Sequence, residues 1–215
     1  MTYLRLLLTV LVFISDYATQ AADTSYVRMG KKSVALPTNA DKVTYETIFN
    51  FDSIYTDKQI YENVKMAISR WFVQPSITTN NHLFKMNNID RQIISEDPET
   101  KTIVANMIFI TARQPNEPKD LQNDLIVIFK GKFIVRESRV KMIFDDVNYY
   151  FTSTGVALLA GPQNSLFNIS LDSFTKSYKL NNYTFNRLFT VDYKMKTFGN
   201  AVAAEIIKNI KQSSF

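Results

Sequence analysis

The chain has 215 residues, of which 46% are hydrophobic and 21% are charged, and this ordinary composition excludes a largely disordered protein. It contains no cysteine and a single histidine, which excludes disulfides, cysteine nucleophiles, thiolate metal sites and zinc sites built on a histidine pair. The formal net charge is +5, so anionic surfaces are the favoured partners on electrostatic grounds.

The first 21 residues have the layout of a secretory signal peptide. Arg5 precedes an apolar run over residues 6–14, and small residues follow up to Ala21. The run is too short to cross a bilayer as a helix, which needs about 20 residues. We therefore predict cleavage after Ala21 and a periplasmic or extracellular protein without a cysteine-linked lipid anchor. An uncleaved membrane anchor is the alternative, and the early Asp16 disfavours it.

The segment after the signal peptide gives two different patterns. Residues 22–42 carry few apolar positions and several loop-forming residues, which predicts a linker or a loose arm. Residues 43–51 place Tyr45, Thr47 and Phe49 on one side of an extended chain, which predicts the first strand.

The strongest local signal predicts a helix over residues 57–73. Thr56 and Gln59 have the spacing of a capping box, and Pro75 is expected to end the element. The apolar residues between them recur at helical spacing: Ile60, Val64, Ala67, Ile68, Trp71 and Phe72. We interpret Trp71 as a core anchor rather than a ligand-stacking residue.

Four further strands are predicted, in two hairpins. The first hairpin joins residues 90–95 to residues 101–110. The second joins residues 124–129 to residues 132–144 through Lys130 and Gly131, because glycine can adopt the positive φ that a tight turn needs.

The last third of the chain is harder to assign. Residues 145–198 mix aromatic residues with Asn, Ser and Thr, and we predict an elaboration of the domain there. Asn200 is expected to cap a final amphipathic helix over residues 201–211. The linker apart, residues 43–215 are predicted to form a single domain.

This order of elements, β-α-β-β-β-β-α, predicts an α+β fold in which two helices cover one face of a curved antiparallel sheet of about five strands. Three segments resemble an exported bacterial family of domains of unknown function with a TBP-like fold: the strand at 45–49, the helix through residues 60–72 and the hairpin at 128–136. The family usually has an acidic residue before the hairpin glycine, where this chain has Lys130. The resemblance implies the fold but no activity, because the family has no established catalytic residues and a fold does not fix a function.

A search for catalytic groups finds none that the sequence supports, and neither a metal nor a cofactor is predicted. His82 is the only histidine and lies in a segment that reads as a loop. Asp145 and Asp146 are adjacent, and adjacent residues of a strand point to opposite faces of the sheet. No transmembrane segment is predicted after the signal peptide, and an exported protein is not expected to bind nucleic acid.

Two candidate sites remain for an envelope ligand or protein. Tyrosines of the aromatic-rich segment are candidates for stacking on a ligand: Tyr149, Tyr150, Tyr178, Tyr183 and Tyr193. A cluster of cations is a candidate anion site: Lys130, Lys132, Arg136, Arg139 and Lys141.

We expect a non-catalytic exported binding module. One alternative is a carboxylate-dependent hydrolase of an envelope polymer, with Glu46, Asp145, Asp172 and Glu205 as candidate acids. A structural component that pairs through an exposed sheet edge is the third reading.

Overall fold

The computed structural model describes residues 23–71, 76–79, 82–85, 93–111, 125–155, 163–176 and 180–213. The predicted signal peptide at residues 1–21 lies outside these ranges. The body is a six-stranded antiparallel sheet made of β4 (Tyr45–Asn50), β7 (Ile93–Asp97), β8 (Thr102–Thr111), β9 (Leu125–Arg136), β10 (Arg139–Gly155) and β11 (Gln163–Ser170). Its helices are α2 (Asp57–Trp71) and α3 (Asn182–Ser213).

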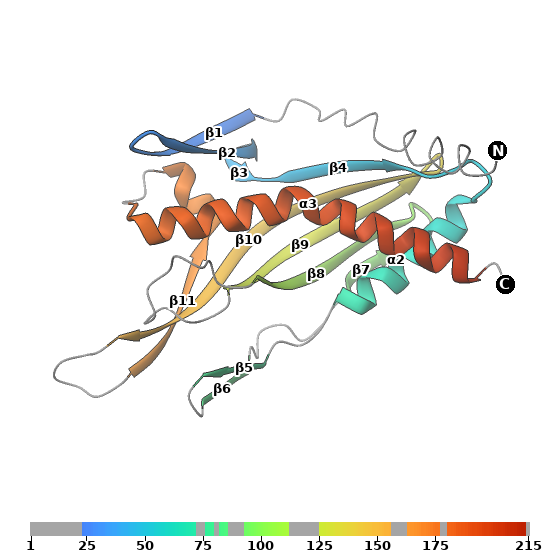
Figure 1. Cartoon of the computed structure of the whole chain (residues 1–215). Coiled ribbons are helices and arrows are strands. Elements are labelled where there is room, and N and C mark those ends of the chain that lie inside the picture. The colour runs from blue at the N-terminus through green and yellow to red at the C-terminus, as the bar shows by residue number, and fades with distance from the viewer. Residues whose placement is uncertain are drawn as a thin grey trace, which may run out of the picture.

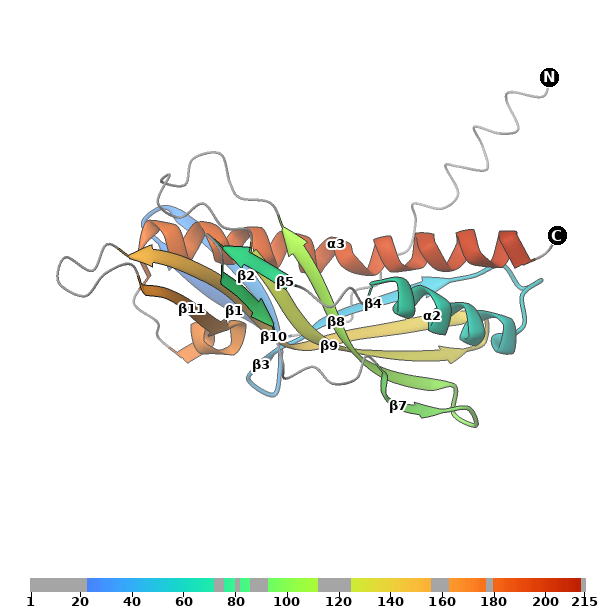
Figure 2. The ribbon, with the colours of Figure 1, turned by 90° about the horizontal axis from the view of Figure 1, so that it is seen from below.

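Both helices lie on the same side of the sheet. Figure 1 shows α3 crossing in front of the strands, and Figure 2 shows α2 and α3 together on one side of β9 and β10. Helix α2 contacts β8 and β9, whereas α3 contacts β4, β10 and α2. The predicted α+β fold with two helices on one face of an antiparallel sheet is confirmed, with one strand more than expected because β11 extends the sheet.

The core lies between the helices and the sheet, and aromatic rings fill its centre. The ring of Phe198 on α3 stacks on Phe109 with centroids 5.6 Å apart. It also meets Phe129 and Phe144 edge-on, with centroids 5.0 Å and 5.5 Å away. Such ring pairs add to the burial of apolar area, so this cluster fixes how α3 sits on the sheet.

Helix α2 begins as the sequence predicts. The Thr56 N–H donates to Gln59 Oε1 at 2.9 Å, and the Gln59 N–H donates to Thr56 Oγ1 at 3.2 Å, which completes the capping box. Ile60, Val64 and Ile68 are fully buried. Residues 72–75, and with them the predicted end of the helix, lie outside the described ranges, and so does the side chain of Trp71.

The linker prediction for residues 22–42 is wrong. The chain there folds into an antiparallel hairpin of β1 (Asp23–Met29) and β2 (Lys32–Asn39), followed by the short strand β3 (Lys42–Val43). Val27, Val34 and Leu36 are buried in the main core. The few apolar residues of this segment are enough to bury one face of the hairpin, because they alternate along the strands. A low apolar content therefore does not exclude strands here.

The second hairpin turns seven residues later than predicted. Gly131 lies within β9, and the turn is made by Glu137 and Ser138, whose φ angles are 53° and 55°. Gly131 serves close packing instead of a turn, because a Cβ atom there would lie 2.9 Å from Phe133 Cε2.

Residues 145–198 continue the body of the fold instead of forming a separate insertion. They complete β10, form β11 and a short 3-10 helix, η3 (Leu171–Lys176), and supply the first half of α3. Asn181 caps α3, because its Oδ1 accepts from the Thr184 N–H at 2.8 Å, and Asn200 therefore lies inside the helix. Within the described ranges no helix has the length and apolar content needed to cross a bilayer.

His82 also differs from its prediction. It opens β6 (His82–Lys85), which pairs with β5 (Ser76–Thr79) in a small hairpin, so its backbone is extended.

Candidate functional site

The face of the sheet that points away from the helices is the candidate binding surface, and we call it the open face. Its residues alternate with the buried ones along β4, β8, β9 and β10, and no described element covers them. They are Glu46, Ile48, Thr102, Val104, Lys130, Lys132, Ile134, Arg136, Arg139, Lys141 and Ile143.

Isoleucines and lysines form a checkerboard on the open face. Lys141 lies opposite Ile48 on one neighbouring strand and opposite Ile134 on the other. Ile143 in turn lies between Glu46 and Lys132. Lysine stems cover apolar neighbours while their ammonium groups stay in water, so the face presents small apolar areas between charges.

All five residues of the predicted basic cluster lie on the open face, but most of them are paired. Lys130 Nζ lies 2.7 Å from Asp146 Oδ2, and Lys141 Nζ lies 2.7 Å from Glu46 Oε1. Lys132 makes no ion pair with a described residue. Local charge is therefore nearly balanced, and an anionic ligand would have to compete with these carboxylates.

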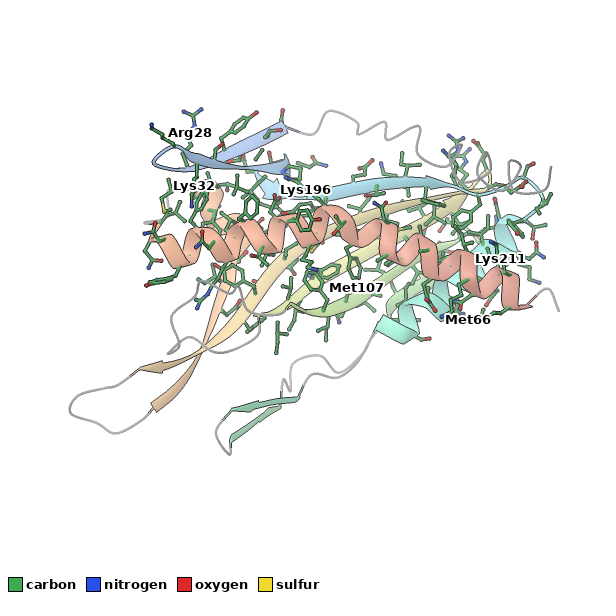
Figure 3. All side chains as sticks on the ribbon, viewed as in Figure 1. Arg28, Lys32, Met66, Met107, Lys196 and Lys211 are labelled. Carbon is green, nitrogen blue, oxygen red and sulfur yellow. The ribbon has the colours of Figure 1, made fainter. Side chains whose placement is uncertain are left out.

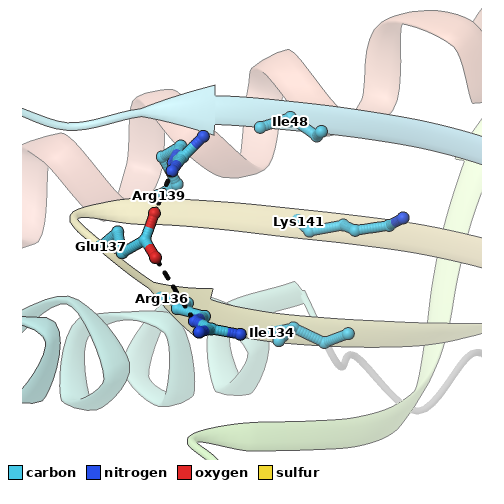
Figure 4. Close-up of a pocket in the computed structure, with 6 residues that line it drawn as sticks. All are labelled: Ile48, Ile134, Arg136, Glu137, Arg139 and Lys141. Atoms are coloured by element: carbon cyan, nitrogen blue, oxygen red, sulfur yellow. Dashed lines mark hydrogen bonds and ion pairs between the residues drawn. The ribbon is translucent and has the colours of Figure 1, made fainter. Parts of the chain in front are cut away.

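A shallow depression lies at the end of the open face, beside the β9–β10 turn. Its volume is about 190 Å³, and Ile48 and Ile134 are the two apolar residues among those that line it. Figure 4 shows Glu137 between the guanidinium groups of Arg136 and Arg139. The Arg136 Nε lies 3.5 Å from Glu137 Oε1, and Arg139 pairs with the other carboxylate oxygen.

The turn that carries Glu137 is fixed from the side of α2. Both of its residues have positive φ, which costs free energy for residues other than glycine. The carboxylate of Asp57 accepts from the N–H of Ser138 at 2.8 Å and from that of Glu137 at 3.3 Å. The Ser138 hydroxyl also donates to the Tyr55 carbonyl at 3.2 Å. The start of α2 thus fixes the backbone of Glu137 and Ser138.

A β-bulge brings Asp145 and Asp146 onto the same face, which strand alternation alone does not predict. The register with β9 shifts between Asp145 and Asn148, and Asp146 has a φ of 52°. The hydrogen bond from Lys130 lowers the pKa of Asp146 below its usual value, whereas burial and the neighbouring Asp146 raise the pKa of Asp145. The described residues contain no group of three or more side chains placed to hold a metal ion.

Of the other candidate acids of a hydrolase, Asp172 lies near enough to Asp145 for its charge to contribute to the raised pKa of Asp145. Glu46 pairs with Lys141, and Asp172 Oδ1 accepts from the Val43 N–H at 2.7 Å. Glu205 lies on α3, on the opposite side of the sheet, 3.7 Å from Lys208.

The predicted tyrosines do not form one site. Tyr149 is fully buried in the core, so it is not free to stack on a ligand, and Tyr150 is half-buried on the open side of β10. Tyr183 and Tyr193 are exposed on α3, on the helix side of the sheet and not on the open face. Tyr178 lies outside the described residues.

On the helix side, a partly buried ionic network surrounds the carboxylate of Asp192. Asp192 accepts from the Tyr45 hydroxyl at 3.0 Å and from Lys196 Nζ at 2.7 Å. Lys196 also donates to the Ala35 carbonyl at 2.8 Å, below the β1–β2 hairpin in Figure 3. Burial raises the pKa of Asp192 despite these donors. The network joins β2, β4 and α3, and we interpret it as structural.

Ile48, Ile134 and Glu137 were missed by the sequence reasoning. The two isoleucines occupy the outward positions of strands, and a search for charged or aromatic clusters passes over them. Glu137 stands between Arg136 and Arg139 in the chain, so the only available signal was an acidic residue inside a basic run.

No family model matches the chain, and no curated protein matches it in sequence. Among solved structures it is similar to a DUF4468 family protein from Bacteroides ovatus, with 14% identity and a TM-score of 0.50 over 81% of this chain and 90% of that one. A TBP-like protein from Parabacteroides distasonis gives 12% identity and a TM-score of 0.49 over 82% and 97% of the two chains. The likeness to the DUF4468 family protein agrees with the predicted resemblance to a family of domains of unknown function, and at 14% identity it concerns the fold alone.

Proposed function

We propose that this protein is an exported, non-catalytic interaction module that binds an envelope ligand or protein through its open face. The observation that carries the proposal is the contrast within one sheet. The covered face is buried under α2 and α3, whereas on the open face Ile48 is 36% exposed and Ile134 and Ile143 are half-buried among charges. Arginine and exposed apolar groups are features of surfaces that contact other molecules.

Export rests on the layout of residues 1–21, and it has a direct test. Expression of the full chain in a Gram-negative host, followed by fractionation and N-terminal sequencing, is expected to give a periplasmic or extracellular protein that begins at Ala22. Recovery of the uncleaved chain from the cytoplasm would contradict export. It would not affect the proposal that the open face binds a ligand or protein.

Native mass spectrometry of the protein purified from the exported fraction tests the binding module. The wild-type protein is expected to carry a reproducible additional mass. The double variant Ile48→Glu/Ile134→Glu should lose it, because two carboxylates then replace the apolar contacts of the open face.

A matched control places the same two charges on the helix side. Ala201→Glu/Ala204→Glu changes two exposed positions of α3 and should keep the additional mass. No additional mass on the wild-type protein, or equal loss in both double variants, would refute the open face as the binding surface.

The hydrolase alternative has one observation in its favour. Asp145 and Asp146 share a face and have pKa values shifted in opposite directions, which is a property of acid–base pairs in enzymes. We rank it second because Asp146 is paired with Lys130. Release of soluble fragments from purified envelope polysaccharide by the wild-type protein but not by Asp145→Asn would reverse this order.

A further inference from the structure

We propose that the depression beside the β9–β10 turn binds an acidic, apolar segment of a protein partner. A carboxylate of the partner takes the place of Glu137 between Arg136 and Arg139, and an adjacent apolar side chain lies on Ile48 and Ile134. This inference rests on the proposed function and names the chemistry of the partner at the open face.

The two arginines supply the charge complementarity. Guanidinium groups bind carboxylates through paired N–H donors, and they lose less hydration than lysine on binding. Arg136 and Arg139 lie opposite each other at the ends of β9 and β10, with their side chains 83% and 52% exposed. Both are therefore accessible to a partner while the strands fix their backbones.

The size of the depression favours a protein segment over a small molecule. Pockets that enclose small ligands have volumes of about 300–1,000 Å³ and bury most of the ligand. At about 190 Å³ on the exposed surface of a sheet, this depression holds one or two side chains. A protein partner can add contacts over the rest of the open face, where Lys132 has no ion pair with a described residue.

Glu137 acts as an internal competitor for the same site. Its carboxylate binds both arginines, and its backbone is fixed by the hydrogen bonds from the turn to Asp57. An arriving carboxylate must displace it, so removal of its charge should strengthen binding. A purely structural role for Glu137 predicts no such gain.

The test is an NMR titration of the full protein with the synthetic peptide Gly-Ser-Leu-Glu-Leu-Ser-Gly and with the same peptide carrying glutamine in place of glutamate. The glutamate peptide is expected to shift amide signals of residues 134–141 and to bind more tightly than its glutamine counterpart. Arg136→Gln/Arg139→Gln should weaken binding about tenfold, because it removes charge-assisted hydrogen bonds. Glu137→Gln should tighten it about threefold, and about 500 mM salt should weaken it.

Arg28→Gln/Lys32→Gln is the matched control for charge. It removes two exposed cations at the tip of the β1–β2 hairpin, at the far end of the molecule in Figure 3, and should leave peptide binding unchanged. Equal affinity for the two peptides, equal weakening in the two double variants, or weaker binding by Glu137→Gln would each overturn the proposal. The Glu137→Gln measurement keeps it falsifiable if the arginine variant does not fold.

Native mass spectrometry separates this inference from the proposed function. If the arginine double variant keeps the additional mass of the wild-type protein, the proposal that the depression binds the partner is refuted, and the proposed interaction module is not. If the wild-type protein carries no additional mass and binds neither peptide, both are refuted.

Discussion

The two faces of the main sheet use the same backbone for different purposes. On β10, Phe144 is fully buried among aromatic rings, whereas its neighbour Ile143 points the other way, between Glu46 and Lys132. Side chains that alternate between faces thus divide one strand into a stabilising row and a solvent-facing row. The residues of the covered face therefore contribute most of the free energy of unfolding. Substitutions on the open face should change that free energy little.

Replacement of these two neighbours gives the largest expected difference between the faces. Phe144→Ala should lower the free energy of unfolding by about 3–5 kcal/mol, because it leaves a cavity under Phe198. Ile143→Ala should lower it by about 1 kcal/mol, because the side chain is only half-buried. Urea unfolding followed by circular dichroism measures both values.

Equal losses for the two variants would break the comparison between the faces. A loss for Phe144→Ala below about 1 kcal/mol would show that the aromatic cluster relaxes around the cavity.

The sequence predicts which residues lie on each face of the sheet, but it does not predict the β-bulge that interrupts the alternation. Residues 139–144 alternate between charged or aliphatic residues and the apolar Val140, Met142 and Phe144, and the latter three are all buried on one side. The bulge after Asp145 depends on the register with β9, and register is a long-range property that one strand's sequence does not contain. The candidate depression was hidden for the same reason, because Ile48 and Ile134 lie far apart in the chain.

Two other elements show different limits of sequence reasoning. The capping box at Thr56 is a local hydrogen-bond pattern, and it predicted the start of α2 correctly. The first half of α3 was missed because Asn, Thr and aromatic residues have modest helix propensity, and burial of Phe185 and Phe198 against the sheet overrides it. The sequence predicts a turn at Gly131 because glycine is typical of turns, whereas its close approach to Met107 of β8 depends on the tertiary fold.

Gly131→Ala tests that close packing on the covered side and has the second-largest expected effect. The new methyl group would meet Phe133 Cε2 at 2.9 Å and Met107 Cγ at 3.1 Å. Overpacking of this kind should lower the free energy of unfolding by about 1–3 kcal/mol. Lys132→Ala, the adjacent open-face position, should change it by less than about 0.5 kcal/mol. A stabilised Gly131→Ala variant would mean that the two side chains move aside freely.

Asp57→Ala tests the link between the covered side and the edge of the open face. It removes the acceptor for the N–H groups of Glu137 and Ser138, and should cost about 1–2 kcal/mol of unfolding free energy. Lys58→Ala, an exposed neighbour, is the control and should be nearly neutral. If Asp57→Ala is equally neutral, the turn holds its shape unaided, and the argument that Glu137 is fixed between the arginines fails.

The smallest effects concern pH, and there the two sides of the sheet should differ in sign. On the open face, the hydrogen bond from Lys130 lowers the pKa of Asp146, so its stabilisation is present above the unfolded pKa of about 3.9 and is lost as the pH falls through the lower folded value. On the helix side, burial raises the pKa of Asp192, so its ionised form costs stability that is regained as the pH falls through the raised value towards about 3.9. The two effects fall in different pH ranges, below about pH 4 for Asp146 and above it for Asp192.

Urea unfolding of the wild-type protein, Asp146→Asn and Asp192→Asn between about pH 7 and pH 3 measures both effects. The free energy of unfolding of the wild-type protein should exceed that of Asp146→Asn by a few tenths of a kcal/mol at neutral pH, because the ion pair is half-exposed, and this difference should vanish below pH 4. The stability of the wild-type protein relative to Asp192→Asn should instead rise as the pH falls towards 4. If both differences move in the same direction, the carboxylate of Asp192 is better solvated, or better paired with Lys196, than its burial implies.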